Sequence, residues 1–164
     1  MSEGLQISVV GSAQGEGDAL RDAEAVGRGI AEAGAVLVCG GRGGVMEAAS
    51  KGASGAGGVV LGVLPTISRE DANPYVSHVV ATGVGEARNL AVVASGDAVI
   101  AIGGEWGTLS EIAYARKLGR PVISLRSWPL SNRAGTDLGI LEADSPEDAV
   151  KVALEAAGAG TGTT

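Results

Sequence analysis

One segment of the chain combines glycines with a hydroxyl group and carboxylates, Gly103-Gly104-Glu105-Trp106-Gly107-Thr108-Leu109-Ser110-Glu111. It follows the apolar run Ala98–Ile102 and precedes a pattern with helical spacing. A strand that leads through glycines into a helix presents free backbone N–H groups, which bind phosphate and other anions. The residues of this segment that we predict to bind a phosphorylated ligand are Gly103, Gly104, Gly107 and Thr108.

Part of this pattern has a structural alternative. If Thr108 is the N-cap of the helix, Glu111 is its third residue, and the two form a capping box that satisfies their backbone N–H groups. A capping box does not need the glycines before it, so the whole segment favours a ligand site.

Two more glycine clusters follow apolar runs, at Gly11-Ser12-Ala13-Gln14-Gly15-Glu16-Gly17 and at Gly40-Gly41-Arg42-Gly43-Gly44-Val45-Met46. Neither matches the dinucleotide fingerprint or the Walker A motif. The second cluster is consistent with a tight strand–helix turn or with a ligand contact, and Arg42 is either a phosphate ligand or a solvated charge. The residues that we add to the predicted phosphate and ligand site are Gly11, Ser12, Gly40, Gly41, Gly43, Gly44 and Met46.

Arg88 and Glu111 supply a cation and a carboxylate for such a site. Taken alone, Arg88 is better explained as a surface charge than as part of a site. Beside a phosphate cleft, an arginine can hold the phosphate while a carboxylate activates water or stabilises a cationic sugar. We therefore predict both as catalytic residues for cleavage of an N-glycosidic bond.

Short apolar runs alternate with helical patterns along the chain. We expect strands at Leu5–Val10, Ala35–Cys39, Val59–Leu64, His78–Thr82, Ala98–Ile102, Pro121–Leu125 and Leu138–Leu141. We expect helices at Ala19–Ala33 with Asp18 as N-cap, Val45–Ser54, Glu86–Ala94, Thr108–Leu118 and from Ser145 to Ala157. Such alternation predicts a doubly wound, Rossmann-like α/β fold with about six or seven mostly parallel strands and helices on both faces. Ligands bind such folds at the carboxyl ends of the strands.

The length of 164 residues and the absence of a linker or repeat indicate one domain, which we place at 1–157. Residues 158–164 are small and polar and are expected to form a flexible tail. The loop from Thr66 to Ser77 is long enough to wall a site. With 28 glycines, no Phe and 2% aromatic residues, the core must be aliphatic.

Composition argues against several functions. A net charge of −7 disfavours nucleic acid as the partner. No apolar run is long enough to cross a membrane, and the N-terminus has no secretory pattern, so we expect a cytoplasmic protein. One cysteine, Cys39, and one histidine, His78, exclude a disulfide and disfavour a metal site.

The motifs resemble those of the Lonely Guy family, formerly labelled lysine decarboxylases. Gly104 and Gly107-Thr108-x-x-Glu111 are similar to the core of its PGGxGTxxE motif, and Gly40-Gly41-x-Gly43-Gly44-Val45-Met46 is similar to its second glycine motif. Arg88 and Glu111 fall where that family has its catalytic Arg and Glu. The resemblance implies a cytokinin riboside 5′-monophosphate phosphoribohydrolase, which needs no cofactor.

Other residues depart from that pattern. Gly103 stands in place of the motif's Pro and Glu105 in place of its second Gly, and Asn89 follows the arginine where Lys is usual. Gly43-Gly44-Val45-Met46-Glu47-Ala48 and Arg88-Asn89-Leu90 look more like the molybdenum-cofactor carrier branch. That branch shares the fold and binds a phosphorylated pterin.

The two resemblances therefore imply two alternative functions. The first is hydrolysis of a nucleoside 5′-monophosphate, and the alternative is a carrier for the molybdenum cofactor, another phosphorylated pterin or a nucleotide. Glu105 discriminates between them, because a carboxylate that faces the cleft would repel phosphate and weaken the hydrolase interpretation. Both branches imply a homodimer, or a tetramer, that pairs through the helices near Arg88–Ala94 and Thr108–Leu118.

Overall fold

The computed structural model describes residues 4–160, which form one seven-stranded sheet. The strands are β1 (Gln6–Gly11), β2 (Val36–Cys39), β3 (Val60–Leu64), β4 (His78–Ala81), β5 (Ala98–Ile102), β6 (Val122–Leu125) and β7 (Ile140–Glu142). Their order across the sheet is β4-β3-β2-β1-β5-β6-β7, and every neighbouring pair is parallel. The winding changes direction between β1 and β5, so the predicted doubly wound α/β fold is confirmed.

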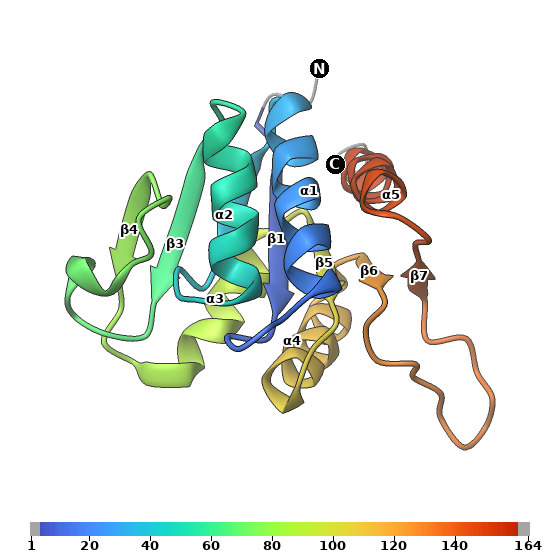
Figure 1. Cartoon of the computed structure of the whole chain (residues 1–164). Helices are drawn as coiled ribbons and strands as arrows, with labels where there is room; N and C mark the ends of the chain where they lie inside the picture. The colour runs from blue at the N-terminus through green and yellow to red at the C-terminus, as the bar shows by residue number, and fades with distance from the viewer. Residues whose placement is uncertain (1–3, 161–164) are drawn as a thin grey trace.

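Helices cover both faces of the sheet (Figure 1). The α-helices are α1 (Asp18–Glu32), α2 (Val45–Gly55), α3 (Arg88–Ser95), α4 (Trp106–Lys117) and α5 (Pro146–Gly160), and short 3-10 helices lie at η1 (Arg69–Asp71) and η2 (Gly85–Ala87). The helices α1, α2 and α5 pack on one face, and α3 and α4 pack on the other. No helix within residues 4–160 is long and apolar enough to cross a membrane.

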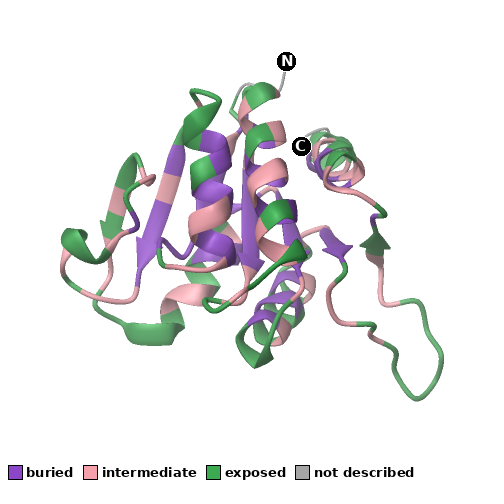
Figure 2. Ribbon diagram, viewed as in Figure 1, coloured by how far each residue is buried: buried purple, intermediate pink, exposed green. Residues whose placement is uncertain are grey.

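Alternation along the central strands builds two aliphatic cores. In β1, Ile7 and Val9 join the core under α1, α2 and α5, whereas Val10 joins the core under α3 and α4. All five residues of β5 are buried, while the edge strands β4 and β7 are largely exposed (Figure 2). The central strands are therefore buried on both faces, as parallel sheets with helices on both sides require.

Some glycines serve helix packing. A Cβ atom on Gly27 of α1 would lie 1.9 Å from the carbonyl oxygen of Ala49, and one on Gly52 of α2 would lie 1.9 Å from that of Glu24. These two glycines let α1 and α2 approach each other backbone to backbone. Part of the high glycine content is thus explained by packing.

Several predicted boundaries were wrong. Gly17 is the cap of α1, so Asp18 is the first helical residue and its side chain makes no cap hydrogen bond. The predicted helix at Glu86–Ala94 is divided between η2 and α3, and the loop Thr66–Ser77 contains η1. Part of the predicted tail is also helical, because α5 continues to Gly160. The rest of that tail, 161–164, lies outside the described residues.

Candidate functional site at the switch point

The glycine clusters after β1 and β5 lie side by side. Gly11, the last residue of β1, is in register with Ile102, the last residue of β5. The turn after β2 packs against the turn after β1, since the Val45 N–H donates to the Ser12 carbonyl at 3.0 Å. The three clusters therefore meet at the carboxyl ends of three neighbouring strands, where doubly wound folds bind ligands.

A cavity of about 340 Å³ opens at this edge, and we name it the switch-point cavity. Its lining residues are Gly11, Ser12, Ala13, Arg42, Met46, Pro65, Glu86, Arg88, Asn89, Glu105, Gly107, Thr108 and Glu111. It brings together both predicted catalytic residues and five of the predicted ligand-binding residues, Gly11, Ser12, Met46, Gly107 and Thr108. The role of these residues in binding stays a prediction.

The other predicted glycines do not line this cavity. They are Gly40, Gly41, Gly43, Gly44, Gly103 and Gly104. Gly44 has a φ of +63°, and a Cβ atom there would lie 2.2 Å from the Ser12 carbonyl oxygen. It therefore joins the turns after β1 and β2.

Gly40 makes room for Arg88. A Cβ atom on Gly40 would lie 2.8 Å from Nη2 of Arg88 and 2.6 Å from Sδ of Met46. The guanidinium thus lies over the end of β2, where its Nη1 donates to the Asn89 side chain. Its buried Nε has no hydrogen-bond partner among residues 4–160, and the same part of the chain offers Arg88 no ion pair. Arg88 therefore keeps donor capacity for a ligand.

The N-terminus of α4 forms another wall. Helix α4 begins at Trp106 with Glu105 as its cap, so Thr108 is its third residue. The capping-box alternative is thereby wrong, because Thr108 is not the cap and no side chain caps this terminus. The first N–H groups of a helix have no intrahelical acceptor, and Gly107 and Thr108 of this first turn line the cavity. This wall can bind an anion.

Glu111 lies at the floor of the cavity and is only 7% exposed. Burial raises the pKa of its carboxyl to about 7, although the nearby positive charge of Arg88 opposes the shift. Burial also lowers the pKa of Arg88, and the charge of Glu111 works against that shift. At neutral pH, Glu111 can therefore hold or release a proton, as a general acid or base must.

Asn73 holds the turn that carries Arg42, and the sequence analysis did not identify it as part of the site. Its Nδ2 donates to the carbonyl oxygen of Arg42 at 3.0 Å, and its N–H donates to that of Gly41 at 2.9 Å. Asn73 is 9% exposed, so these bonds are shielded from water. Through Asn73, the loop 66–77 thus supports the turn after β2 that carries Arg42. The sequence analysis predicted that this loop could wall a site, but nothing in it singled out Asn73.

The ring of Trp106, the first residue of α4, contacts another tryptophan. The rings of Trp106 and Trp128 lie 5.4 Å apart between centroids, and Trp106 is 76% exposed. Trp106 does not line the switch-point cavity, so its ring packs at the start of α4. Within residues 4–160, no group of three His, Cys, Asp or Glu side chains could hold a metal ion.

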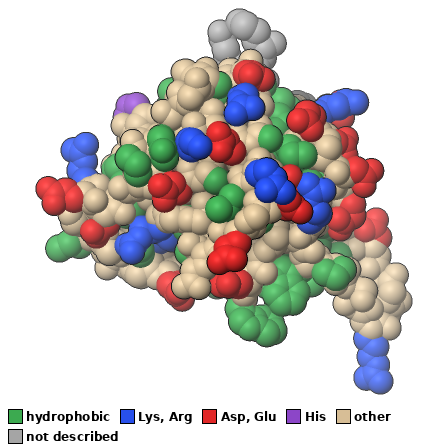
Figure 3. Space-filling view, in the orientation of Figure 1, with side chains coloured by type: hydrophobic (Ala, Val, Ile, Leu, Met, Phe, Trp, Pro, Cys, Tyr) green, Lys and Arg blue, Asp and Glu red, His purple; other side chains and the backbone are tan. Residues whose placement is uncertain are grey.

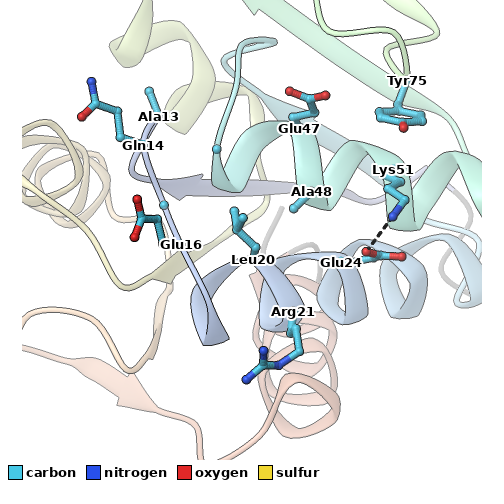
Figure 4. Close-up of a pocket in the computed structure, with 12 residues that line it drawn as sticks. Ala13, Gln14, Glu16, Leu20, Arg21, Glu24, Glu47, Ala48, Lys51 and Tyr75 are labelled. Carbon is cyan, nitrogen blue, oxygen red and sulfur yellow. Dashed lines mark hydrogen bonds and ion pairs between the residues drawn. The ribbon is translucent and has the colours of Figure 1, made fainter.

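A larger cavity, about 640 Å³, lies between α1 and α2 on the other side of Ala13, and we name it the α1–α2 groove (Figure 4). Lys51 crosses it from α2 to form an ion pair with Glu24 of α1 at 3.2 Å. Arg21, which also lines it, pairs with Asp18. Both cations of the groove are thus neutralised, and charges of the two signs are interspersed across this face of the molecule (Figure 3).

Known proteins resemble this chain over almost its whole length. An uncharacterized protein of Archaeoglobus fulgidus is 41% identical over 150 residues, 92% of this chain and 95% of the relative. The molybdenum cofactor binding protein of Rippkaea orientalis is 38% identical with a TM-score of 0.81, over 90% of this chain and 94% of that one. The molybdenum cofactor carrier protein of Chlamydomonas reinhardtii is 34% identical with a TM-score of 0.84, over 93% and 97%.

A more distant likeness concerns the fold alone. DNA processing protein A of Streptococcus pneumoniae is 23% identical with a TM-score of 0.70, over 90% of this chain and 61% of that one.

The family model described as SLOG cluster4 matches residues 4–151. Together these matches confirm the resemblance drawn from the glycine motifs, and the chain belongs to the SLOG cluster4 family.

Proposed function

We propose that this protein binds a phosphorylated pterin of the molybdenum-cofactor type, as a carrier that does not turn its ligand over. The observation that carries this proposal is the 38% and 34% identity, over nine-tenths of the chain, to proteins described as binding and carrying that cofactor. Glu105 supports it further, because it lines the cavity at the position where the hydrolase motif has a glycine.

The phosphate would lie on the inner part of the switch-point cavity. Arg88 offers unpaired guanidinium donors there, and α4 offers the N–H groups of Gly107 and Thr108. Arginine and a helix N-terminus are both strong phosphate ligands, the first through charge-assisted hydrogen bonds. Arg42 adds a second positive charge at the rim. The pterin is the cargo of this site.

A second candidate function is hydrolysis of a nucleoside 5′-monophosphate to a base and ribose 5-phosphate. The observation in its favour is the buried Glu111, whose pKa of about 7 suits proton transfer at neutral pH. In this reaction Arg88 would hold the phosphate, and Glu111 would activate the attacking water or stabilise the cationic sugar.

The two functions are separated by one experiment. The protein is titrated with a pterin monophosphate, AMP and GMP by calorimetry, and each mixture is then analysed for free base by chromatography. Binding without base release is the expected result. Base release that disappears in Glu111→Gln would establish the hydrolase instead, and failure of every ligand to bind would refute the carrier proposal.

We also propose that the protein is a homodimer, which pairs through α3 and α4. Leu90 of α3 and Tyr114 of α4 are 41% and 46% exposed and line a hollow that shares Glu86, Asn89 and Gly107 with the switch-point cavity. Leu118, which directly follows α4, is 46% exposed. Light scattering should report a dimer, or a tetramer built from it, and Tyr114→Glu should shift it toward the monomer. A monomeric wild-type protein would contradict this assembly.

A further inference from the structure

The charges of the switch-point cavity are divided between its walls. Arg42 and Arg88 come from the turn after β2 and from α3, whereas Glu105 and Glu111 come from the turn after β5 and from α4. Depth divides them as well, because Glu111 is buried at the floor and Glu105 is exposed at the rim. A fifth charge, Glu86, is also exposed and lies on η2.

The backbone of Glu105 is held in place. Its carbonyl oxygen accepts a hydrogen bond from Nε1 of Trp128 at 3.2 Å and another from the N–H of Leu109 at 3.0 Å. Trp128 is itself in ring contact with Trp106, the first residue of α4. The carboxylate therefore projects from a fixed point of the cavity wall.

The carboxylate of Glu105 is free to bind a ligand. It makes no cap hydrogen bond to α4, and among residues 4–160 it has no hydrogen-bond or ion-pair partner. A carboxylate has two acceptor oxygens and no donor. It repels a phosphate group, so its partner in a bound ligand must present N–H or O–H donors.

On this basis, and resting on the proposed function, we propose that Glu105 is the specificity-determining residue of the cavity and accepts two hydrogen bonds from a 2-amino-4-oxopyrimidine edge. Pterin and guanine present this edge, in which a ring N–H lies beside an exocyclic amino group. Two parallel N–H donors match the two oxygens of a carboxylate in the bidentate way. The phosphate of the same ligand then lies deeper, beside Arg88 and Thr108.

Hypoxanthine and adenine lack this pair of donors. Hypoxanthine keeps the ring N–H and loses the amino group, and adenine presents an acceptor where guanine has the ring N–H. When either base binds, the carboxylate of Glu105 meets at most one donor in place of two and keeps an unpaired oxygen. This lowers the affinity for that base. The cavity should therefore prefer GMP over IMP and AMP.

The test is calorimetric titration of the full chain with GMP, IMP and ribose 5-phosphate. GMP is expected to bind about 10-fold more tightly than IMP, since one hydrogen bond to a charged group is lost. In Glu105→Gln that preference should fall to about 2-fold or less, because the amide replaces one acceptor by a donor, while ribose 5-phosphate should bind at least as well as before.

Glu86→Gln is the matched control, since it removes another rim carboxylate of the same cavity and should keep the preference for GMP. Equal binding of GMP and IMP by the wild type would overturn the inference. So would a preference that survives in Glu105→Gln or is lost equally in Glu86→Gln. If ribose 5-phosphate binds in these cases, the proposed phosphate site stands, but Glu105 does not recognise the base. If none of the three ligands binds, the proposed phosphate site fails, and this inference fails with it, whereas the carrier proposal is tested separately by the pterin monophosphate.

Discussion

Two of the cavities of the molecule share Ala13 in their lining, and the smaller of these two has the charged groups and backbone donors that a ligand site needs. The α1–α2 groove measures about 640 Å³, but its two cations are paired with Glu24 and Asp18. The switch-point cavity measures about 340 Å³, and its two arginines have no ion-pair partner within the described residues. Size alone does not identify a ligand site, because convergent polar groups and shifted pKa values mark such sites as well.

The two cavities also differ in how deeply their charged groups are buried. The charged groups of the groove are exposed enough for water to screen them, and Arg21 and Asp18 are each 75% exposed. In the switch-point cavity, burial shifts the pKa values of both Arg88 and Glu111. Buried groups with shifted pKa values are typical of functional sites.

The largest effect is expected at Gly44, which lines the α1–α2 groove and joins the turns after β1 and β2. Gly44→Ala places a Cβ atom 2.2 Å from the Ser12 carbonyl oxygen at a φ of +63°. We expect a loss of about 2–4 kcal/mol in the free energy of unfolding, because both the contact and the backbone conformation are unfavourable. Urea denaturation measures it. Gly43→Ala is the control, since its added Cβ would meet only ordinary contacts, 3.5 Å or more away; equal losses would contradict the account.

The next largest effect concerns ligand binding in the switch-point cavity. Arg88→Gln should weaken ribose 5-phosphate binding about 10- to 100-fold, because charge-assisted hydrogen bonds to the phosphate are lost. Calorimetry gives the affinities. Arg28→Gln removes a cation from the exposed surface of α1 and should bind as the wild type does. Comparable losses in the two variants would mean that binding responds only to net charge.

The buried carboxyl group of Glu111 makes the free energy of unfolding depend on pH. Its pKa is about 7 in the folded protein against an ordinary 4.5, so the folded state holds an extra proton between these values. Wild-type stability should therefore fall as pH rises from about 4.5 to about 7. The side chain of Glu111→Gln does not ionise, so this variant avoids the cost of a buried negative charge. At pH 8 we expect its free energy of unfolding to be about 1–3 kcal/mol higher than that of the wild type, and the difference should vanish near pH 4.

Chemical denaturation at several pH values measures this difference. Glu47→Gln removes a carboxylate from the α1–α2 groove and serves as the matched control. If the two variants change the pH dependence of stability equally, the effect does not arise from burial of Glu111.

The smallest effect should come from the groove itself. Lys51→Gln breaks the pair with Glu24, in which the two side chains are 52% and 34% exposed. Exposed pairs contribute little, so we expect a loss below about 0.5 kcal/mol and no change in ribose 5-phosphate affinity. A clear loss of affinity would assign the ligand to the groove and reverse the comparison.

The sequence analysis predicted most of the framework. Alternating apolar runs and helical patterns predicted the parallel sheet, because the periods of strands and helices are local properties. Cap positions were less predictable. Asp18 and Thr108 have good capping side chains, but Gly17 and Glu105 cap the helices, since packing at the sheet edge decides where each helix begins.

The chemistry of the site was predicted only in part. Arg88 and Glu111 stand out as a cation and a carboxylate near glycine motifs, and the fold brings both to one cavity. Asn73 gave no signal of this kind, because its bonds to Gly41 and Arg42 join segments about 30 residues apart. Contacts between distant segments depend on how the strands are ordered in the sheet.

By itself, the amino-acid sequence determined the α/β framework, the aliphatic core and the position of glycine turns after the strands, because these follow from local periodicity and backbone freedom. Only the tertiary structure decided what each glycine does: Gly27 and Gly52 let helices touch, Gly44 joins two turns, and Gly40 admits Arg88. It also decided which charges remain unpaired, and how far burial raises the pKa of Glu111. These properties arise from the surroundings of each group, which exist only once the chain is folded.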